Sequence, residues 1–323
     1  MGERGFLIPI LIYSSLLLVL VPTAAFTWGP GTHAYFAKEL GEGRLDSQEI
    51  YAATVPDLFN LKSDSPYYDY IVDQTHRHET IVKTKARKMG LDPFALGFVS
   101  HNERWGADYT AHRRGRTTKE GYVITKSRGL ALKLKSPLQD VLENAGVPSA
   151  SFLAGLIASE LTHPLIETAV DLLIKRNEDP SIGLELFHSA QDRSPSVPDL
   201  LVSAYAKGLA RHQKLSYDEA SQIIREAEAE YQQMMILYGE VFAQEESEAI
   251  QDLAEQGATL IEGHINSAIG EEVEIPSDVL VAFIYLAIQD VEGDYGQEIA
   301  STLAYLKHRR GISSLLHRIL KTY

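Results

Sequence analysis

The chain has 323 residues, a formal net charge of −14, 45% apolar residues and no cysteine. The absence of cysteine excludes disulfides and thiolate zinc sites, so a metal ion would have to be held by His, Asp, Glu or backbone atoms. The acidic balance argues against a surface built to grip nucleic-acid phosphates, and we expect no stable nucleic-acid binding.

The first 27 residues have the pattern of a secretory signal peptide. Arg4 precedes an apolar run from Phe6 to Val21, and a proline and three small residues follow it. The run is shorter than the roughly 20 residues that a spanning helix needs, so an uncleaved membrane anchor is the weaker interpretation. Residues 1–27 therefore predict a secreted or periplasmic protein, with cleavage after Ala25 or Thr27.

The rest of the chain carries a helical pattern. Apolar residues recur at steps of three and four, with Ser, Asp or Pro near the start of the stretches 151–161, 164–176, 198–213, 217–244 and 249–269. The only alternating pattern, at 120–126, is too short and too isolated to make a sheet. The predicted class is all-α.

Pro, Gly and Ser gather where we expect the connections, at 60–68, 113–121, 177–183 and 192–198. We predict a single multi-helix domain. Residues 28–198 would be its histidine-rich catalytic region, and residues 199–323, which show no constellation of metal ligands, would pack on it as a scaffold.

Several histidines lie at helical spacing from a carboxylate. His163 and Glu167 are four residues apart, as are Asp108 and His112, so each pair projects from one helix face. His101 precedes Asp108 by seven residues, which on an unbroken helix would return it to within about 20° of the same face. One such pair alone is typical of a solvated ion pair.

Other candidate ligands come earlier in the chain: His33, Asp57, and the neighbours His76 and His78. Zinc prefers histidine nitrogen and carboxylate oxygen, with about four ligands per ion, and a hydrolytic site leaves one position open for water. The candidates are too many for one ion and suit a cluster of three.

The ordered set of motifs resembles the zinc-dependent phospholipase C family, to which the fungal single-strand nucleases are related in fold. The motifs that carry the resemblance are WGPGTH, VPDLF, THRHET, GFVSHNERWGADYTAH and THPLIETAVD, over residues 28–171. In that family the mature chain begins with a tryptophan whose α-amino nitrogen and carbonyl oxygen bind zinc. The resemblance implies that Trp28 has this role and that the turn at residues 29–31 brings His33 to the same ion.

The resemblance also implies how the remaining ligands are shared among up to three zinc ions. Asp108 would bridge the first two ions, and a third ion would lie apart from them. The first ion would be held by Asp57, one of His76 or His78, His101 and Asp108; the second by Trp28, His33 and Asp108; the third by His112, His163 and Glu167.

This sequence departs from the family pattern at three places. The family has three residues between the ligand His and Asp, whereas NERWGA separates His101 from Asp108, which on an unbroken helix would place them about 10 Å apart along the axis. We therefore predict that the helix bulges or breaks at Gly106. Cleavage after Ala25 would also leave two residues before Trp28. The motif THRHET also offers two histidines where the pattern needs one, so His76 is favoured and His78 stays the alternative.

The predicted function is zinc-dependent hydrolysis of phosphodiesters of the phospholipase C kind. The resemblance implies that a zinc-bound hydroxide attacks phosphorus, with Asp57 as the orienting or proton-accepting carboxylate. The expected partner is a phospholipid or a membrane surface, and no protein partner is implied. A single-strand nuclease and a non-catalytic zinc-binding module remain the alternatives.

Two further features have open interpretations. The basic stretch at residues 112–119 could meet an anionic head group, although such a run is usually solvated. The aromatic residues Phe59, Tyr67 and Tyr68 could line a pocket near Asp57 or could pack in the core.

Overall fold

The computed structural model describes residues 28–41, 46–62, 65–113, 120–269 and 274–321, and the predicted signal peptide lies outside them. These residues form α-helices and two short 3-10 helices, and no strand occurs among them, which confirms the predicted all-α class. In chain order the elements are α2 (Pro30–Leu40), α3 (Ser47–Thr54), η1 (Val55–Asp57), η2 (Asn60–Lys62), α4 (Tyr68–Arg77), α5 (Thr80–Lys88), α6 (Asp92–His101), α7 (Ala107–His112), α8 (Tyr122–Asn144), α9 (Ala150–Asn177), α10 (Ile182–Gln191), α11 (Val197–Gln213), α12 (Tyr217–Ala243), α13 (Glu246–Ile269), α14 (Ser277–Val291) and α15 (Tyr295–Lys321).

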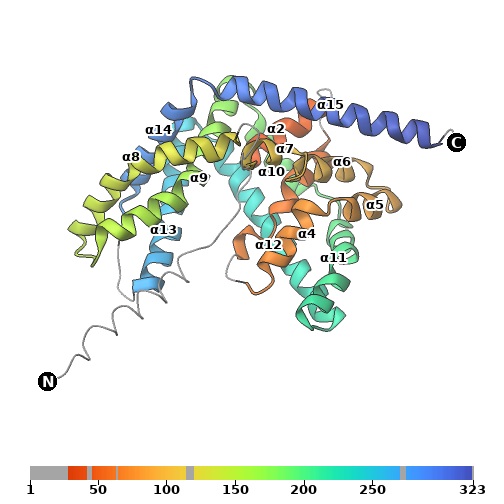
Figure 1. Ribbon diagram of the computed structural model, residues 1–323, viewed down its shortest axis with the longest axis horizontal. Helices are drawn as coiled ribbons and strands as arrows, with labels where there is room; N and C mark the ends of the chain where they lie inside the picture. The colour runs from red at the N-terminus through yellow and green to blue at the C-terminus, as the bar shows by residue number, and fades with distance from the viewer. Residues whose placement is uncertain (1–27, 42–45, 63–64, 114–119, 270–273, 322–323) are drawn as a thin grey trace.

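Helices α8 and α9 form a long hairpin, and each of them runs through a proline (Figure 1). The apolar stretches 151–161 and 164–176 are thus one helix that continues through Pro164. An interior proline removes one backbone hydrogen bond and costs about 3 kcal/mol. Buried leucines at every fourth position of α8, together with the apolar face of α9, pack over the full length of the hairpin and offset that loss.

The alternating segment at 120–126 is the start of α8. Gly121 precedes the helix, and its carbonyl oxygen accepts a hydrogen bond from Thr125 Oγ1 at 2.9 Å. Tyr122 and Val123 are consecutive and both buried, which a strand with one solvated face would not allow.

The buried apolar side chains form two cores. In Figure 1 the helices α8, α9 and α14 of the first core lie on the left, and α4, α5, α6 and α11 of the second lie on the right. The first core is built mainly from α2, α7, α8, α9, α14 and α15, and the second from α4, α5, α6, α11 and α12. Helix α3 contributes to both, because Ala53 lies in the first core and Ala52 in the second. Helices from the second half of the chain therefore pack in both cores: α14 and α15 in the first, and α11 and α12 in the second.

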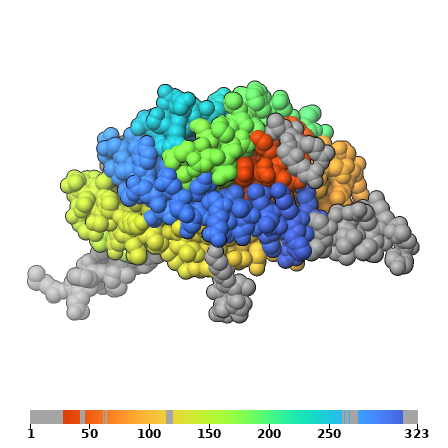
Figure 2. Space-filling model, turned by 90° about the horizontal axis from the view of Figure 1, so that it is seen from above, coloured from red at the N-terminus to blue at the C-terminus, as the bar shows by residue number. Residues whose placement is uncertain are grey.

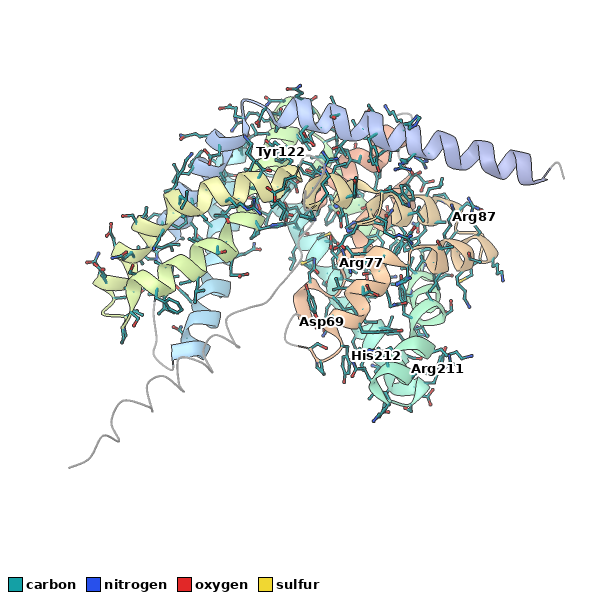
Figure 3. All side chains as sticks on the ribbon, viewed as in Figure 1. Asp69, Arg77, Arg87, Tyr122, Arg211 and His212 are labelled. Atoms are coloured by element: carbon teal, nitrogen blue, oxygen red, sulfur yellow. The ribbon has the colours of Figure 1, made fainter. Side chains whose placement is uncertain are left out.

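Helix α15 lies across the face seen in Figure 2, with α2 on one side of it and α8 on the other. Thr302 donates a hydrogen bond to Thr110 Oγ1 at 3.0 Å, and Trp28 Nε1 donates to the same oxygen at 3.1 Å. Trp28 also stacks on Tyr122, which is labelled in Figure 3, with ring centroids 5.6 Å apart. These contacts fix α7, which carries two of the candidate ligands, against both ends of the described chain. Within the described residues, no helix is long and apolar enough to cross a membrane.

Candidate metal centre

A break between α6 and α7 brings His101 to Asp108. Helix α6 ends at His101 and α7 begins at Ala107. Between them, Asn102 Oδ1 accepts hydrogen bonds from the backbone amides of Arg104 and Trp105, at 3.0 and 2.9 Å. Gly106 is required in this turn, since a Cβ there would lie 2.4 Å from the carbonyl oxygen of His101. The predicted break at Gly106 is confirmed, and His101 Nε2 lies 2.9 Å from Asp108 Oδ2.

Three sets of side chains come close enough to share a metal ion. In the His33 group, which consists of His33, His101 and Asp108, His33 Nε2 lies 3.2 Å from Asp108 Oδ1. The rings of His33 and His101 are stacked with centroids 4.1 Å apart and an interplanar angle of 13°. Asp108 thus turns one carboxylate oxygen toward each histidine.

The His76 group consists of Asp57, His76 and His101. Asp57 Oδ1 lies 3.2 Å from His76 Nε2 and 3.7 Å from His101 Nε2. His76 Nε2 is also 3.7 Å from Asp108 Oδ2. The His33 and His76 groups therefore share His101 and adjoin at Asp108.

The His163 group consists of His112, His163 and Glu167. Glu167 Oε1 lies 2.9 Å from His163 Nε2 and 3.7 Å from His112 Nε2, and the two Nε2 atoms are 2.9 Å apart. The spacing of four residues between His163 and Glu167 gives this contact within α9. Asp108 and His112 have the same spacing on α7, but they do not pair: Asp108 belongs to the His33 group and His112 to the His163 group.

These separations suit ligands of one ion. A tetrahedral zinc ion with bonds of about 2.0 to 2.2 Å holds its ligand atoms about 3.3 to 3.6 Å apart. In each group the candidate ligand atoms all lie within 4.8 Å of one another. The donor set of imidazole nitrogen and carboxylate oxygen is also the one that zinc prefers.

Several of these atoms are buried and lack a hydrogen bond among the described residues. They are His101 Nε2, both carboxylate oxygens of Asp108, and Glu167 Oε1. His101 Nε2 and Asp108 Oδ2 are close in distance, but their orientation does not fit an N–H donor pointing at an acceptor. Because a buried unpaired polar atom costs about 1 to 3 kcal/mol, a cation between these atoms accounts for the arrangement better than a failed hydrogen bond.

Backbone carbonyls fix the orientation of the histidine rings. His101 Nδ1 donates to the carbonyl oxygen of Ala53 at 2.8 Å, and His76 Nδ1 donates to that of Val72 at 3.1 Å. A proton on Nδ1 leaves Nε2 as the ligand atom, and hydrogen bonding of this kind is usual for metal-binding histidines. The backbone carbonyl of Ala53 therefore orients one of the candidate ligands.

The electrostatics of the groups favour a bound cation. Burial raises the pKa of Asp108, but the neighbouring His101 and His33 outweigh it and hold that pKa well below its usual range. Burial and the charge of His101 lower the pKa of His33. Burial lowers the pKa of His101, but Asp108 and Asp57 raise it to about 9 overall. Ionised Asp108 and neutral His33 are the forms that bind a metal ion. Asp108 and Asp57 favour a positive charge beside His101, and a metal ion would supply such a charge.

His78 lies apart from the three groups. Its side chain is 51% exposed and its Nε2 lies 3.3 Å from Asp73 Oδ2, whereas the side chain of His76 is 1% exposed and points into the centre. His78 is the C-cap residue of α4, so the helix ends between the two histidines and sends them in different directions. Of the two alternatives, only His76 is placed to be a ligand.

The side chain of Trp28 is buried in the protein core. The indole is 1% exposed, and it belongs to the first core. The predicted role of its α-amino nitrogen depends on cleavage within residues 1–27, which lie outside the described residues. Phe59 and Tyr68 are buried in the second core and Tyr67 packs against it, which favours packing over a pocket. Six residues of the basic stretch, 114–119, also lie outside the described part.

The metal centre draws on both cores. His33, Asp108 and the ligands on α9 come from elements of the first core, while Asp57, His76 and His101 come from elements of the second. Three of its side chains are partly exposed: Asp57 and His112 at 14% each and His163 at 18%.

One buried acid escaped the sequence analysis. Asp171 lies one turn beyond Glu167 on α9 and accepts hydrogen bonds from the start of α2. The available signal was the spacing of four residues between the two acids, together with the glycines before His33.

No family model, curated protein or solved structure matches this chain. The resemblance to the zinc-dependent phospholipase C family therefore rests on the ordered motifs.

Proposed function

We propose that this protein is a zinc-dependent phosphodiester hydrolase, with phospholipids as the favoured substrate class. The observation that carries the proposal is the convergence of histidines and carboxylates from α2, η1, α4, α6, α7 and α9 into three groups, two of which share His101. The choice of phospholipid over nucleic acid rests on the motif resemblance and on the net charge of −14.

The proposed reaction needs two or more cations at a partly open site. Bound zinc ions would lower the pKa of a water molecule to about 7 and would neutralise charge on the phosphate oxygens. Asp57 is a partly exposed carboxylate of the His76 group, and its pKa is lowered: burial raises it, but His101 and His76 outweigh that effect. It is therefore ionised and able to orient a nucleophile or accept its proton.

The insertion between His101 and Asp108 is the feature of the sequence that favours a non-catalytic module, because it separates two candidate ligands of one ion. The break at residues 102–106 absorbs the extra residues and leaves the two ligand atoms 2.9 Å apart. That reason therefore no longer holds, although a centre that binds metal without turnover stays an outcome of the test.

The test is metal counting and hydrolysis on the purified mature protein, with its N-terminal sequence determined in parallel. Phosphatidylcholine vesicles and single-stranded DNA are the two substrates, each assayed with bound metal, after chelation, and after zinc is restored. We expect two or three zinc ions per chain and release of a phosphorylated head group that chelation abolishes and zinc restores.

The other outcomes distinguish the alternatives. Zinc-dependent cleavage of DNA without lipid hydrolysis would indicate a nuclease. Two or three zinc ions without hydrolysis of either substrate would indicate a binding module, and a protein that binds no zinc would overturn the proposal.

A further inference from the structure

The start of α2 is held by a carboxylate from a distant helix. Asp171 Oδ2 accepts a hydrogen bond from the Gly31 amide at 2.7 Å, and Asp171 Oδ1 accepts one from the Thr32 amide at 2.7 Å and one from Thr32 Oγ1 at 2.5 Å. The residue before the helix, Gly29, offers no side-chain cap, and Pro30 has no amide hydrogen. Asp171 therefore satisfies the free amides of the first turn.

The glycines around Pro30 make this approach possible. A Cβ at Gly29 would lie 2.5 Å from Asp171 Oδ2, and one at Gly31 would lie 2.9 Å from Asp171 Cγ. The two glycines of WGPG thus let the backbone approach the buried carboxylate of Asp171 closely.

The surroundings of Asp171 keep it in place and ionised. Tyr238 on α12 donates a hydrogen bond to Asp171 Oδ2 at 3.0 Å, and the carboxylate is fully buried. Burial raises the pKa of Asp171 to about 6, while the hydrogen bonds from Thr32 and Gly31 oppose the rise. At pH 7 the anion faces the positive end of the α2 dipole.

The residue that follows this anchored turn is His33. Its amide donates to the carbonyl oxygen of Gly29 at 3.0 Å, which is the first hydrogen bond within the helix, and its ring reaches Asp108 at 3.2 Å. Asp171 also lies four residues after Glu167, so one face of α9 carries both a member of the His163 group and the anchor of α2.

We propose that Asp171 is a positioning residue of the metal centre: by capping α2 it sets the imidazole of His33 against Asp108, and through α9 it ties the His33 group to the His163 group. This inference rests on the metal centre of the proposed function. Asp171 touches no candidate ligand side chain, and its effect passes through the backbone of α2.

The test compares zinc content and zinc affinity, measured by elemental analysis and by competition with a chelator, in variants of the full mature protein. Asp171→Asn replaces one acceptor with an amide that opposes the donors of α2. We expect it to lose about one zinc ion per chain, with the affinity of the remaining ions unchanged. Asp179→Asn is the matched control, because Asp179 also binds α2, through Lys38 Nζ at 2.6 Å, but five residues beyond His33. We expect this control to keep all of its zinc.

Two milder substitutions, both at Thr32, test the same inference if the Asp171→Asn protein does not fold. Thr32→Val keeps the shape of the side chain and removes one hydrogen bond to Asp171, while Thr32→Ser keeps the hydroxyl. We expect Thr32→Val to weaken the binding of one zinc ion about tenfold and Thr32→Ser to restore it. Unchanged zinc content and affinity in both Asp171→Asn and Thr32→Val would overturn this inference alone. Absence of zinc from the unaltered protein would overturn it together with the proposed function.

Discussion

His76 Nε2 lies 3.7 Å from Asp108 Oδ2, although α4 packs in one core and α7 in the other. Asp108 is fully buried, and its two oxygens face His33 on one side and His101 on the other. The contact between the cores at this point consists of ionisable side chains in place of apolar ones. A metal ion bound here would therefore link the two cores as well as serve a reaction.

Asp108→Asn should remove the ions that depend on the bridging carboxylate. An amide keeps the size of the side chain but lacks the negative charge that neutralises the cation. We therefore expect this variant to lose about two zinc ions per chain and its hydrolytic activity. Zinc content and circular dichroism of the purified variant are the measurements. A variant that keeps both its zinc and its activity would show that the bridging assignment is wrong.

Glu167→Gln is the matched change in the His163 group. Because Glu167 Oε1 is near His163 and His112 and belongs to neither of the other groups, we expect the loss of about one ion only. Loss of all ions from this variant would mean that the groups do not bind metal independently.

The two neighbouring histidines on α4 should behave differently. His76→Ala removes a buried ring from the centre, and we expect it to lower zinc content. His78→Ala removes a half-exposed ring, and we expect its zinc content to be unchanged and its free energy of unfolding to stay within about 0.5 kcal/mol of the starting protein. Equal effects of the two changes on zinc content would contradict the placement of His76.

The helical class and the positions of α9, α11, α12 and α13 followed from the sequence because the apolar pattern is local. The ligand pair His163 and Glu167 followed for the same reason, since a spacing of four residues within one helix fixes the contact. The break at Gly106 was predictable because an unbroken helix would have kept His101 from Asp108. These features depend on a few neighbouring residues or on one geometric requirement.

Other features depend on contacts between distant segments. The choice between His76 and His78 is decided by the end of α4, and the continuity of α9 through Pro164 is decided by its packing on α8. The anchoring of α2 by Asp171 joins residues 139 and 140 positions apart. No local pattern encodes such a contact, although the glycines of WGPG mark a place where another group comes close to the backbone.

Substitution of two glycines, one between α6 and α3 and one in open space, tests whether α6 is packed tightly against α3. A Cβ at Gly97 would lie 2.0 Å from the carbonyl oxygen of Glu49, so Gly97→Ala must push apart two helices that bring His101 to Ala53. We expect it to lower the free energy of unfolding by about 2 kcal/mol or more and to weaken zinc binding. Gly129, inside α8, has open space around it, and Gly129→Ala should raise the free energy of unfolding by about 0.5 to 1 kcal/mol. Chemical denaturation of both variants measures the difference; a Gly97→Ala protein as stable as the parent would show that the helices can separate without cost.

Lys38 should stabilise the fold through two carboxylates that are mostly buried. Its Nζ lies 2.6 Å from Asp179 Oδ2 and 2.7 Å from Glu185 Oε1, and both acidic side chains are 10% exposed. Lys38→Met keeps much of the side-chain volume but leaves two acids without their cation, so we expect the free energy of unfolding at pH 7 to fall by about 1 to 2 kcal/mol. Lys62→Met is the control, because its partner Glu230 is 53% exposed, and it should change stability by less than about 0.5 kcal/mol.

The effect of Lys38→Met should also depend on pH. Burial raises the pKa of Asp179, but the Lys38 ammonium outweighs burial and lowers it below the ordinary value of about 3.9. A carboxyl group with a lowered pKa in the folded state stabilises that state above the unfolded pKa, and it loses this contribution as the pH falls through the folded pKa. The stability difference between the parent and Lys38→Met should therefore be full at pH 6 to 7 and shrink below about pH 4. Urea denaturation across this range measures it, and a difference that grows on acidification would show that the ion pair is not its source.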